Sequence, residues 1–155
     1  METRQKPRFI ALPVLLVGFL VAIGAAAGPG TAESPKDYGS AVVAEVTSIY
    51  DGDTFRGNIA GYPAIIGERI PVRIAGIDCP ELKDKRPEVK AKALEAKQYT
   101  VKRLREGKKI ELLELRRDKY FRILARVVID GEDLGAELIK AGLAKPYDGG
   151  TKEAW

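Results

Sequence analysis

Short segments in which apolar residues alternate with polar ones predict β-strands in the chain. The first two segments are separated by the turn-forming run Asp51–Thr54, so they predict a hairpin. The last two lie on either side of a charged turn at residues 116–119. Strands are predicted at residues 41–50, 55–60, 70–77, 109–115 and 122–129.

Two segments have the spacing of amphipathic helices. Residues 87–106 place apolar side chains at helical intervals, with Pro87 suited to the first turn and Gly107 to the C-terminal cap. Residues 132–141 predict a second helix that buries Leu134, Leu138 and Ile139. The order of strands and helices is α+β, and short strands around one small core suit a compact five-stranded barrel.

The N-terminus has the pattern of an export signal. Basic residues precede an uncharged, strongly apolar run at residues 9–27, and small residues follow it. The run is close to the ~20 residues that span a bilayer, so a cleaved signal peptide and an uncleaved membrane anchor both stay open, with cleavage favoured. We expect residues 1–32 to be this segment, 33–40 a flexible spacer, and 41–155 the folded domain. The domain is then secreted, periplasmic or anchored to the outer face of the cytoplasmic membrane.

The composition restricts the chemistry available to the domain. The chain has no histidine and one cysteine, Cys79. Nucleophilic sites that need histidine, His-based zinc sites, Cys-rich zinc sites and an internal disulfide are therefore excluded. Catalysis would have to come from carboxylates, arginines, hydroxyls and a hard metal ion.

Basic residues are concentrated in the second half of the chain. Residues 83–122 contain 15 Lys and Arg against 7 Asp and Glu, whereas the whole chain has a net charge of only +4. Such a segment attracts a polyanion such as nucleic acid, or an anionic membrane surface. A solvated, ion-paired helix face explains the same pattern without any ligand.

Three short segments carry residues suited to catalysis. Residues 51–54 read Asp-Gly-Asp-Thr, which is also an ordinary hairpin turn. Residues 73–81 place Arg73 inside an apolar strand, where an unpaired guanidinium would be costly, and end in Asp78 and Glu81. Residues 118–122, Asp-Lys-Tyr-Phe-Arg, form a charged turn that would otherwise be a solvated hairpin tip.

Together with Gly-Leu-Ala-Lys at residues 142–145, these motifs resemble the staphylococcal nuclease (thermonuclease) family over roughly residues 42–147. The resemblance implies an OB-type β-barrel with about three helices and one active-site Ca²⁺. It implies metal binding by Asp53, Asp78 and the main-chain carbonyl of Cys79. By the same resemblance, Arg73 and Arg122 bind phosphate and Glu81 is the general base, while Lys119, Tyr120 and, more weakly matched, Tyr147 contact the substrate.

The resemblance predicts an exported, Ca²⁺-dependent nuclease that hydrolyses phosphodiester bonds of DNA or RNA through in-line attack of water. It is expected to act as a monomer and to touch membrane only through an uncleaved N-terminal segment. The alternative is a non-catalytic module that keeps the barrel and binds nucleic acid or protein. Cys79, Phe121 and the longer segment 55–72 depart from the family pattern, in which positions 79 and 121 are usually Thr and Gly.

Overall fold

The structure is a computed structural model and describes residues 36–155. The predicted signal or anchor segment lies outside these residues. Among the helices of the described part, none is both long and apolar enough to span a bilayer. The described elements are β1 (Ala41–Ile49), β2 (Thr54–Ile59), α1 (Ala64–Gly67), β3 (Ile70–Ile74), β4 (Ile77–Asp78), α2 (Pro87–Glu106), β5 (Ile110–Arg117), β6 (Ile123–Ile129), β7 (Glu132–Asp133), α3 (Leu134–Lys140) and β8 (Lys145–Pro146).

Five of the strands close into a barrel, which confirms the predicted architecture. Their order is β3-β2-β1-β5-β6, and β6 then pairs with β3 in parallel, so the sheet returns to its first strand. The other pairs in this ring are antiparallel. Closure leaves the ring without free edges and turns alternate side chains inward. The inward side chains make one apolar core, which includes Phe55, Val72, Leu112 and Val127.

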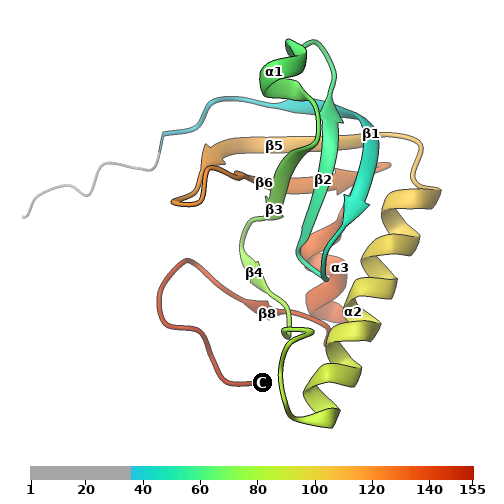
Figure 1. The fold of residues 1–155 in the computed structure, drawn as a ribbon, viewed down its shortest axis with the longest axis vertical. Helices are drawn as coiled ribbons and strands as arrows, with labels where there is room; N and C mark the ends of the chain where they lie inside the picture. Colours follow the sequence, from blue (N-terminus) through green and yellow to red (C-terminus); the bar gives the residue numbers. More distant parts are fainter. Residues whose placement is uncertain (1–35) are drawn as a thin grey trace, which may run out of the picture. The chain divides into compact units, whose positions relative to one another are not determined.

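Two helices cover the lower part of the barrel (Figure 1). Helix α2 has the predicted bounds, with Pro87 in its first turn and Gly107 directly after it. It buries Val89, Ala93, Ala96, Thr100 and Leu104, while most of its lysines and glutamates face solvent. Helix α3 begins at Leu134, where the Asp133 side chain accepts a hydrogen bond from the Ala136 amide and caps the helix.

Three details differ from the prediction. The strand expected at residues 70–77 ends at Ile74, because Gly76 has a φ of 78° and turns the chain before β4. Ile139, expected to be buried, is 37% exposed, whereas Leu134 and Leu138 are fully buried. The segment between β2 and β3 contains the short helix α1, which is only four residues long and therefore leaves no helical periodicity in the sequence.

Candidate active site

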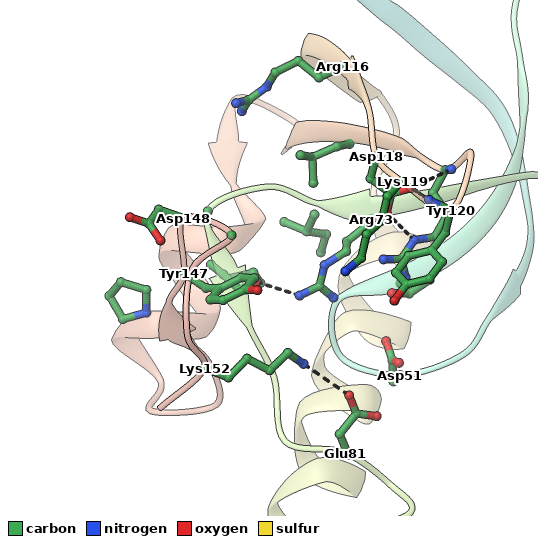
Figure 2. A pocket seen from close by; sticks show the side chains of 18 of the residues that line it. Asp51, Arg73, Glu81, Arg116, Asp118, Lys119, Tyr120, Tyr147, Asp148 and Lys152 are labelled. Atoms are coloured by element: carbon green, nitrogen blue, oxygen red, sulfur yellow. Dashed lines mark hydrogen bonds and ion pairs between the residues drawn. The ribbon is translucent and has the colours of Figure 1, made fainter. Parts of the chain in front are cut away.

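One open pocket of about 1150 Å³ collects the charged ends of several elements. It lies where the β1–β2 turn, the end of β3, the β5–β6 turn and the chain after β8 come together (Figure 2). Its charged and tyrosine side chains come from Asp51, Arg73, Glu81, Arg116, Asp118, Lys119, Tyr120, Arg122, Tyr147, Asp148, Lys152 and Glu153.

Arg73 lines this pocket and links two buried carboxylates, Asp53 and Asp78, that are not themselves among the lining residues. Its guanidinium donates to Asp53 Oδ1 through Nη1, and to Asp78 Oδ1 through Nη2 at 3.2 Å. Nη2 also donates to the Ile77 carbonyl at 3.1 Å. The Arg73 side chain is only 12% exposed, so its charge is compensated by these acids rather than by water. Burial lowers the Arg73 pKa, but Asp53 and Asp78 outweigh this effect and raise it.

The turn that carries Asp53 is tied to the neighbouring elements. Asp53 Oδ2 accepts a hydrogen bond from the Cys79 amide at 3.0 Å, and Oδ1 accepts one from the Thr54 hydroxyl at 2.9 Å. The Gly52 carbonyl accepts a hydrogen bond of 2.7 Å from Thr100 on α2. A Cβ at Gly52 would lie 2.7 Å from the Cys79 Sγ atom, so only glycine fits between the turn and its neighbours.

The β5–β6 turn places a second arginine in the pocket. Asp118 Oδ2 accepts a hydrogen bond of 2.7 Å from Arg122 Nε, and Oδ1 accepts from the amides of Tyr120 and Arg122. Burial raises the pKa of Asp118, but the hydrogen bonds from Arg122 and the backbone outweigh it and lower the pKa overall. Asp118 therefore fixes Arg122 in position beside Tyr120, whose ring centroid lies 5.3 Å from the guanidinium carbon.

The segment after β8 brings another cation to the acids. The Tyr147 amide donates to the Gly76 carbonyl at 2.9 Å, which holds the start of the segment against the end of β3. Lys152 Nζ lies 2.7 Å from Asp78 Oδ1 and 3.5 Å from Glu81 Oε1. Figure 2 shows the Lys152 ammonium directed at the Glu81 carboxylate across the pocket.

Two further groups of this region have raised pKa values. Burial, followed by the charge of Asp53, raises the pKa of Asp51 to about 6. Burial also raises the pKa of the Cys79 thiol, with Asp53 next in importance. A thiol that stays protonated is a poor nucleophile, so Cys79 contributes its backbone rather than its sulfur to this site.

The pocket brings together most of the residues predicted from the sequence. Arg73 touches Asp53 and Asp78, and Arg73, Glu81, Lys119, Tyr120, Arg122 and Tyr147 all line the pocket. The amide of Cys79 points to Asp53; the predicted role of its carbonyl stays a prediction. Sequence reasoning missed Asp51, Asp118 and Lys152. Asp51 and Asp118 lie inside the motifs already noted, whereas no local pattern marked Lys152.

The two buried carboxylates beside Arg73 have donor atoms of the type that a hard divalent cation prefers. Asp53 and Asp78 supply carboxylate oxygens that converge on one guanidinium. Asp51 lies two residues from Asp53, and burial raises its pKa, with the charge of Asp53 as the second cause. Within residues 36–155 no cluster of three or more acidic, cysteine or histidine side chains is arranged to hold a metal. The remaining ligands would be backbone, water or substrate oxygens.

A closed five-stranded barrel with a charged pocket at its strand ends, in which arginines are paired with carboxylates, defines a small α+β protein of the OB-barrel type. The family model described as staphylococcal nuclease homologue matches residues 71–154, more than half of the chain. The chain belongs to this family, as the motifs indicated. Asp53 lies before the matched region, whereas Arg73, Asp78, Glu81 and Arg122 lie within it.

Fungal proteins named probable endonucleases are similar to this chain. The protein of Pyrenophora tritici-repentis is 33% identical over 129 residues, covering 69% of this chain and 47% of the relative. The protein of Pyricularia oryzae is 35% identical over 123 residues, covering 66% of this chain and 48% of the relative. A relative in Schizosaccharomyces pombe is 32% identical over 127 residues, covering 67% of this chain and 55% of the relative. The chain thus spans about half the length of the curated relatives it matches.

Proposed function

We propose that this protein is a Ca²⁺-dependent nuclease that hydrolyses phosphodiester bonds of DNA, RNA or both. One observation carries the proposal: Arg73 lines a pocket together with Glu81 and Arg122, and it is paired with the buried Asp53 and Asp78. The family is generally metal-dependent, and the three fungal relatives are named probable endonucleases. Both facts support a metal-assisted hydrolase that acts on nucleic acid.

The two arginines are suited to bind the phosphate. Guanidinium groups present planar forks of donors that match phosphate oxygens. Arg122 is kept in place by Asp118, and Arg73 by Asp53 and Asp78, so both donors are oriented before the substrate arrives. Preorganised donors of this kind stabilise the charge that develops on the phosphate in the transition state, and each typically contributes about 10²–10³ in rate.

Glu81 is the candidate general base. Its side chain is more than half exposed at the pocket wall, so water can reach it. A carboxylate in this position can accept a proton from the water that attacks the phosphorus, a role that typically contributes about 10²–10⁴ in rate. Lys152 lies beside Glu81, with its Nζ atom 3.5 Å from Glu81 Oε1.

Asp53 and Asp78 would hold the cation. Ca²⁺ prefers oxygen ligands, and when bound it supplies positive charge next to the phosphate. The ligand-supporting contacts come from this chain: Thr54 and the Cys79 amide orient Asp53, and Arg73 orients Asp78.

Substitution of Glu81 by Gln tests the proposal. The parent protein should cleave single-stranded DNA in millimolar CaCl₂ and stop when the chelator EGTA is added. The Glu81→Gln variant should lose about 10²-fold or more in cleavage rate but still bind the DNA, because the isosteric amide cannot accept the proton. Gel analysis of labelled oligonucleotides measures cleavage, and fluorescence anisotropy measures binding.

The exposed Glu132 provides the control, because Glu132→Gln removes the same charge outside the pocket and should keep the parent rate. A parent protein without chelator-sensitive cleavage would contradict the proposal. Binding without cleavage by the parent would instead favour the non-catalytic module.

We also propose that the domain works outside the cytoplasm, as the apolar segment at residues 9–27 suggests. The higher Ca²⁺ concentrations found outside cells suit a site with only two carboxylate ligands. Mass spectrometry of the N-terminus of the exported protein distinguishes a cleaved signal from a retained anchor.

A further inference from the structure

The β5–β6 turn exposes two neighbouring aromatic side chains. Tyr120 is 66% exposed and lines the pocket, whereas Phe121 is 75% exposed and lies beyond the lining residues. The proposed chemistry gives no role to Phe121. A large apolar ring with this exposure contributes little to the stability of the fold, and together with Tyr120 it forms a pair of exposed aromatic rings beside the pocket.

The backbone makes this placement costly. Phe121 has a φ of 62°, in the left-handed region that a bulky side chain disfavours and glycine adopts freely. The conformation is imposed by its neighbours, because the Phe121 amide donates to the Asp118 carbonyl at 3.1 Å and the Phe121 carbonyl accepts from Arg117 Nη1 at 3.2 Å. A ring kept at such a position is a candidate for function rather than for packing.

Basic side chains surround the two rings. The guanidinium carbon of Arg117 lies 5.8 Å from the Phe121 ring centroid, and Lys119 Nζ lies 5.2 Å from that of Tyr120. The turn at residues 116–122 contains four basic residues and one acid. Alternating cations and exposed aromatic rings match a strand whose phosphates bind the cations while its bases stack on the rings.

We propose that Phe121 is a base-stacking residue that binds an unpaired nucleotide outside the pocket, on the strand whose phosphodiester lies between Arg73 and Arg122. The inference rests on the proposed nuclease function and deepens it by adding a nucleotide contact made by a residue outside the pocket. Bases of a duplex are already stacked on one another, so Phe121 could reach them only after unstacking. Single strands and unpaired ends offer a free base to the ring.

The Phe121→Gly variant should separate binding from stability. Glycine suits the left-handed backbone, so the melting temperature should stay the same or rise. The affinity for a single-stranded oligonucleotide should fall about tenfold, because one stacked base is lost. The affinity for a duplex of the same sequence should change less than twofold. Anisotropy titrations of the full-length chain in CaCl₂, with Glu81→Gln present in every protein to prevent cleavage, measure both affinities.

Two substitutions test whether stacking is the cause. Phe121→Trp keeps an aromatic face and should retain the parent affinity, whereas Phe121→Leu keeps apolar bulk without that face and should bind weakly. Tyr62, which is 44% exposed and lies outside the pocket, supplies the matched control: Tyr62→Ala should not change the affinity for single strands.

If Phe121→Gly lowers the affinity for the single strand and for the duplex equally, the proposal is overturned, because the ring would then not discriminate between the two. A single-strand affinity within twofold of the parent would overturn it as well, and would direct attention to a protein partner for this surface. If the parent cleaves DNA with Ca²⁺ but the Phe121 variants do not show the expected affinities, the nuclease function stands and the stacking role of Phe121 is wrong. If the parent neither binds nor cleaves nucleic acid, both the nuclease function and the stacking role are wrong.

Discussion

Asp51 carries a charge that its surroundings disfavour. It lies in the β1–β2 turn, its Oδ1 atom accepts a hydrogen bond from the Asp53 amide, and burial together with Asp53 raises its pKa from 3.8 to about 6. A carboxyl group whose pKa is raised by folding contributes its full stability below the unfolded-state pKa. That contribution is lost as the pH rises through the folded-state pKa.

Asp51→Asn should therefore stabilise the metal-free protein at neutral pH. In the parent, the contribution of Asp51 to the free energy of unfolding should fall between about pH 4 and pH 6. The variant should be more stable than the parent by about 1–3 kcal/mol at pH 7, and equally stable below pH 4. Urea unfolding of freshly purified protein in EGTA across this range provides the measurement. A difference that does not depend on pH would contradict the assignment of the effect to this carboxyl.

The residue types in the sequence predicted the kind of chemistry at the site, but they did not identify every residue that forms it. The absence of histidine directed attention to acids and arginines, and the motif containing Arg73 and Asp78 proved to be an ion-paired cluster. Lys152 could not be found in this way, because a lysine in a polar tail has no periodicity or spacing that predicts a partner. Its contact with Asp78 exists only because the chain folds back after β8.

Among the elements, the segment from β8 to Trp155 shows most clearly how a short stretch completes the pocket. Its far end is held where the Trp155 ring lies between two lysines, 5.5 Å from Lys92 Nζ and 5.0 Å from Lys145 Nζ. Its middle carries Lys152 to Asp78 and Glu81. The segment thus supplies a positive charge at the same carboxylate that is proposed to bind Ca²⁺.

Lys152→Met should tighten Ca²⁺ binding. Methionine keeps the apolar stem but removes a charge 2.7 Å from Asp78, and like charges so close repel strongly even at an effective dielectric constant of about 20. We expect an increase in affinity of about tenfold, measured by isothermal titration calorimetry. Lys140→Met removes the same charge from the exposed end of α3 and should leave the affinity unchanged. Weaker Ca²⁺ binding by Lys152→Met would show instead that the segment supports the site through packing.

Elements with strong local signals were predicted best. Helix α2 has a proline in its first turn, an apolar stripe and a glycine after its end, and its bounds were correct. The apolar pattern at residues 70–77 hid a break, because a glycine with positive φ leaves the sequence pattern of a strand unchanged. Helical periodicity also could not predict that Ile139 is exposed, because its exposure depends on which neighbours cover each face of α3.

At the scale of the whole molecule, the parallel pairing of β3 with β6 closes the barrel. It joins Val72 with Ile123 and Arg73 with Leu124, residues about fifty positions apart. The same pairing places Arg73 next to the start of β6, where Arg122 enters the pocket. No pattern along the chain reveals such a pairing; the barrel was predicted from the strand count and from the family resemblance.

Val72→Ala should weaken the fold and the site together. Val72 is fully buried at the closing pair, and loss of its methyl groups should cost about 2–3 kcal/mol of unfolding free energy. Below its melting temperature the variant should keep the parent cleavage rate, because the charged groups remain in place. Thermal unfolding followed by circular dichroism and by loss of cleavage should give coincident transitions in both proteins. Loss of cleavage at a lower temperature than unfolding would show that the site opens independently of the barrel.

The pocket draws on residues from Asp51 to Lys152, about a hundred positions apart, and this spread affects the order of events during synthesis. A growing chain that has emerged only as far as β5 can pair β2 with β3, but it lacks β6, which closes the barrel, and it lacks Arg122 and Lys152, so the pocket is incomplete. We therefore expect a nascent chain to be harmless to the messenger RNA and ribosome that produce it. Cleavage can begin only after almost the entire domain has left the exit tunnel and closed.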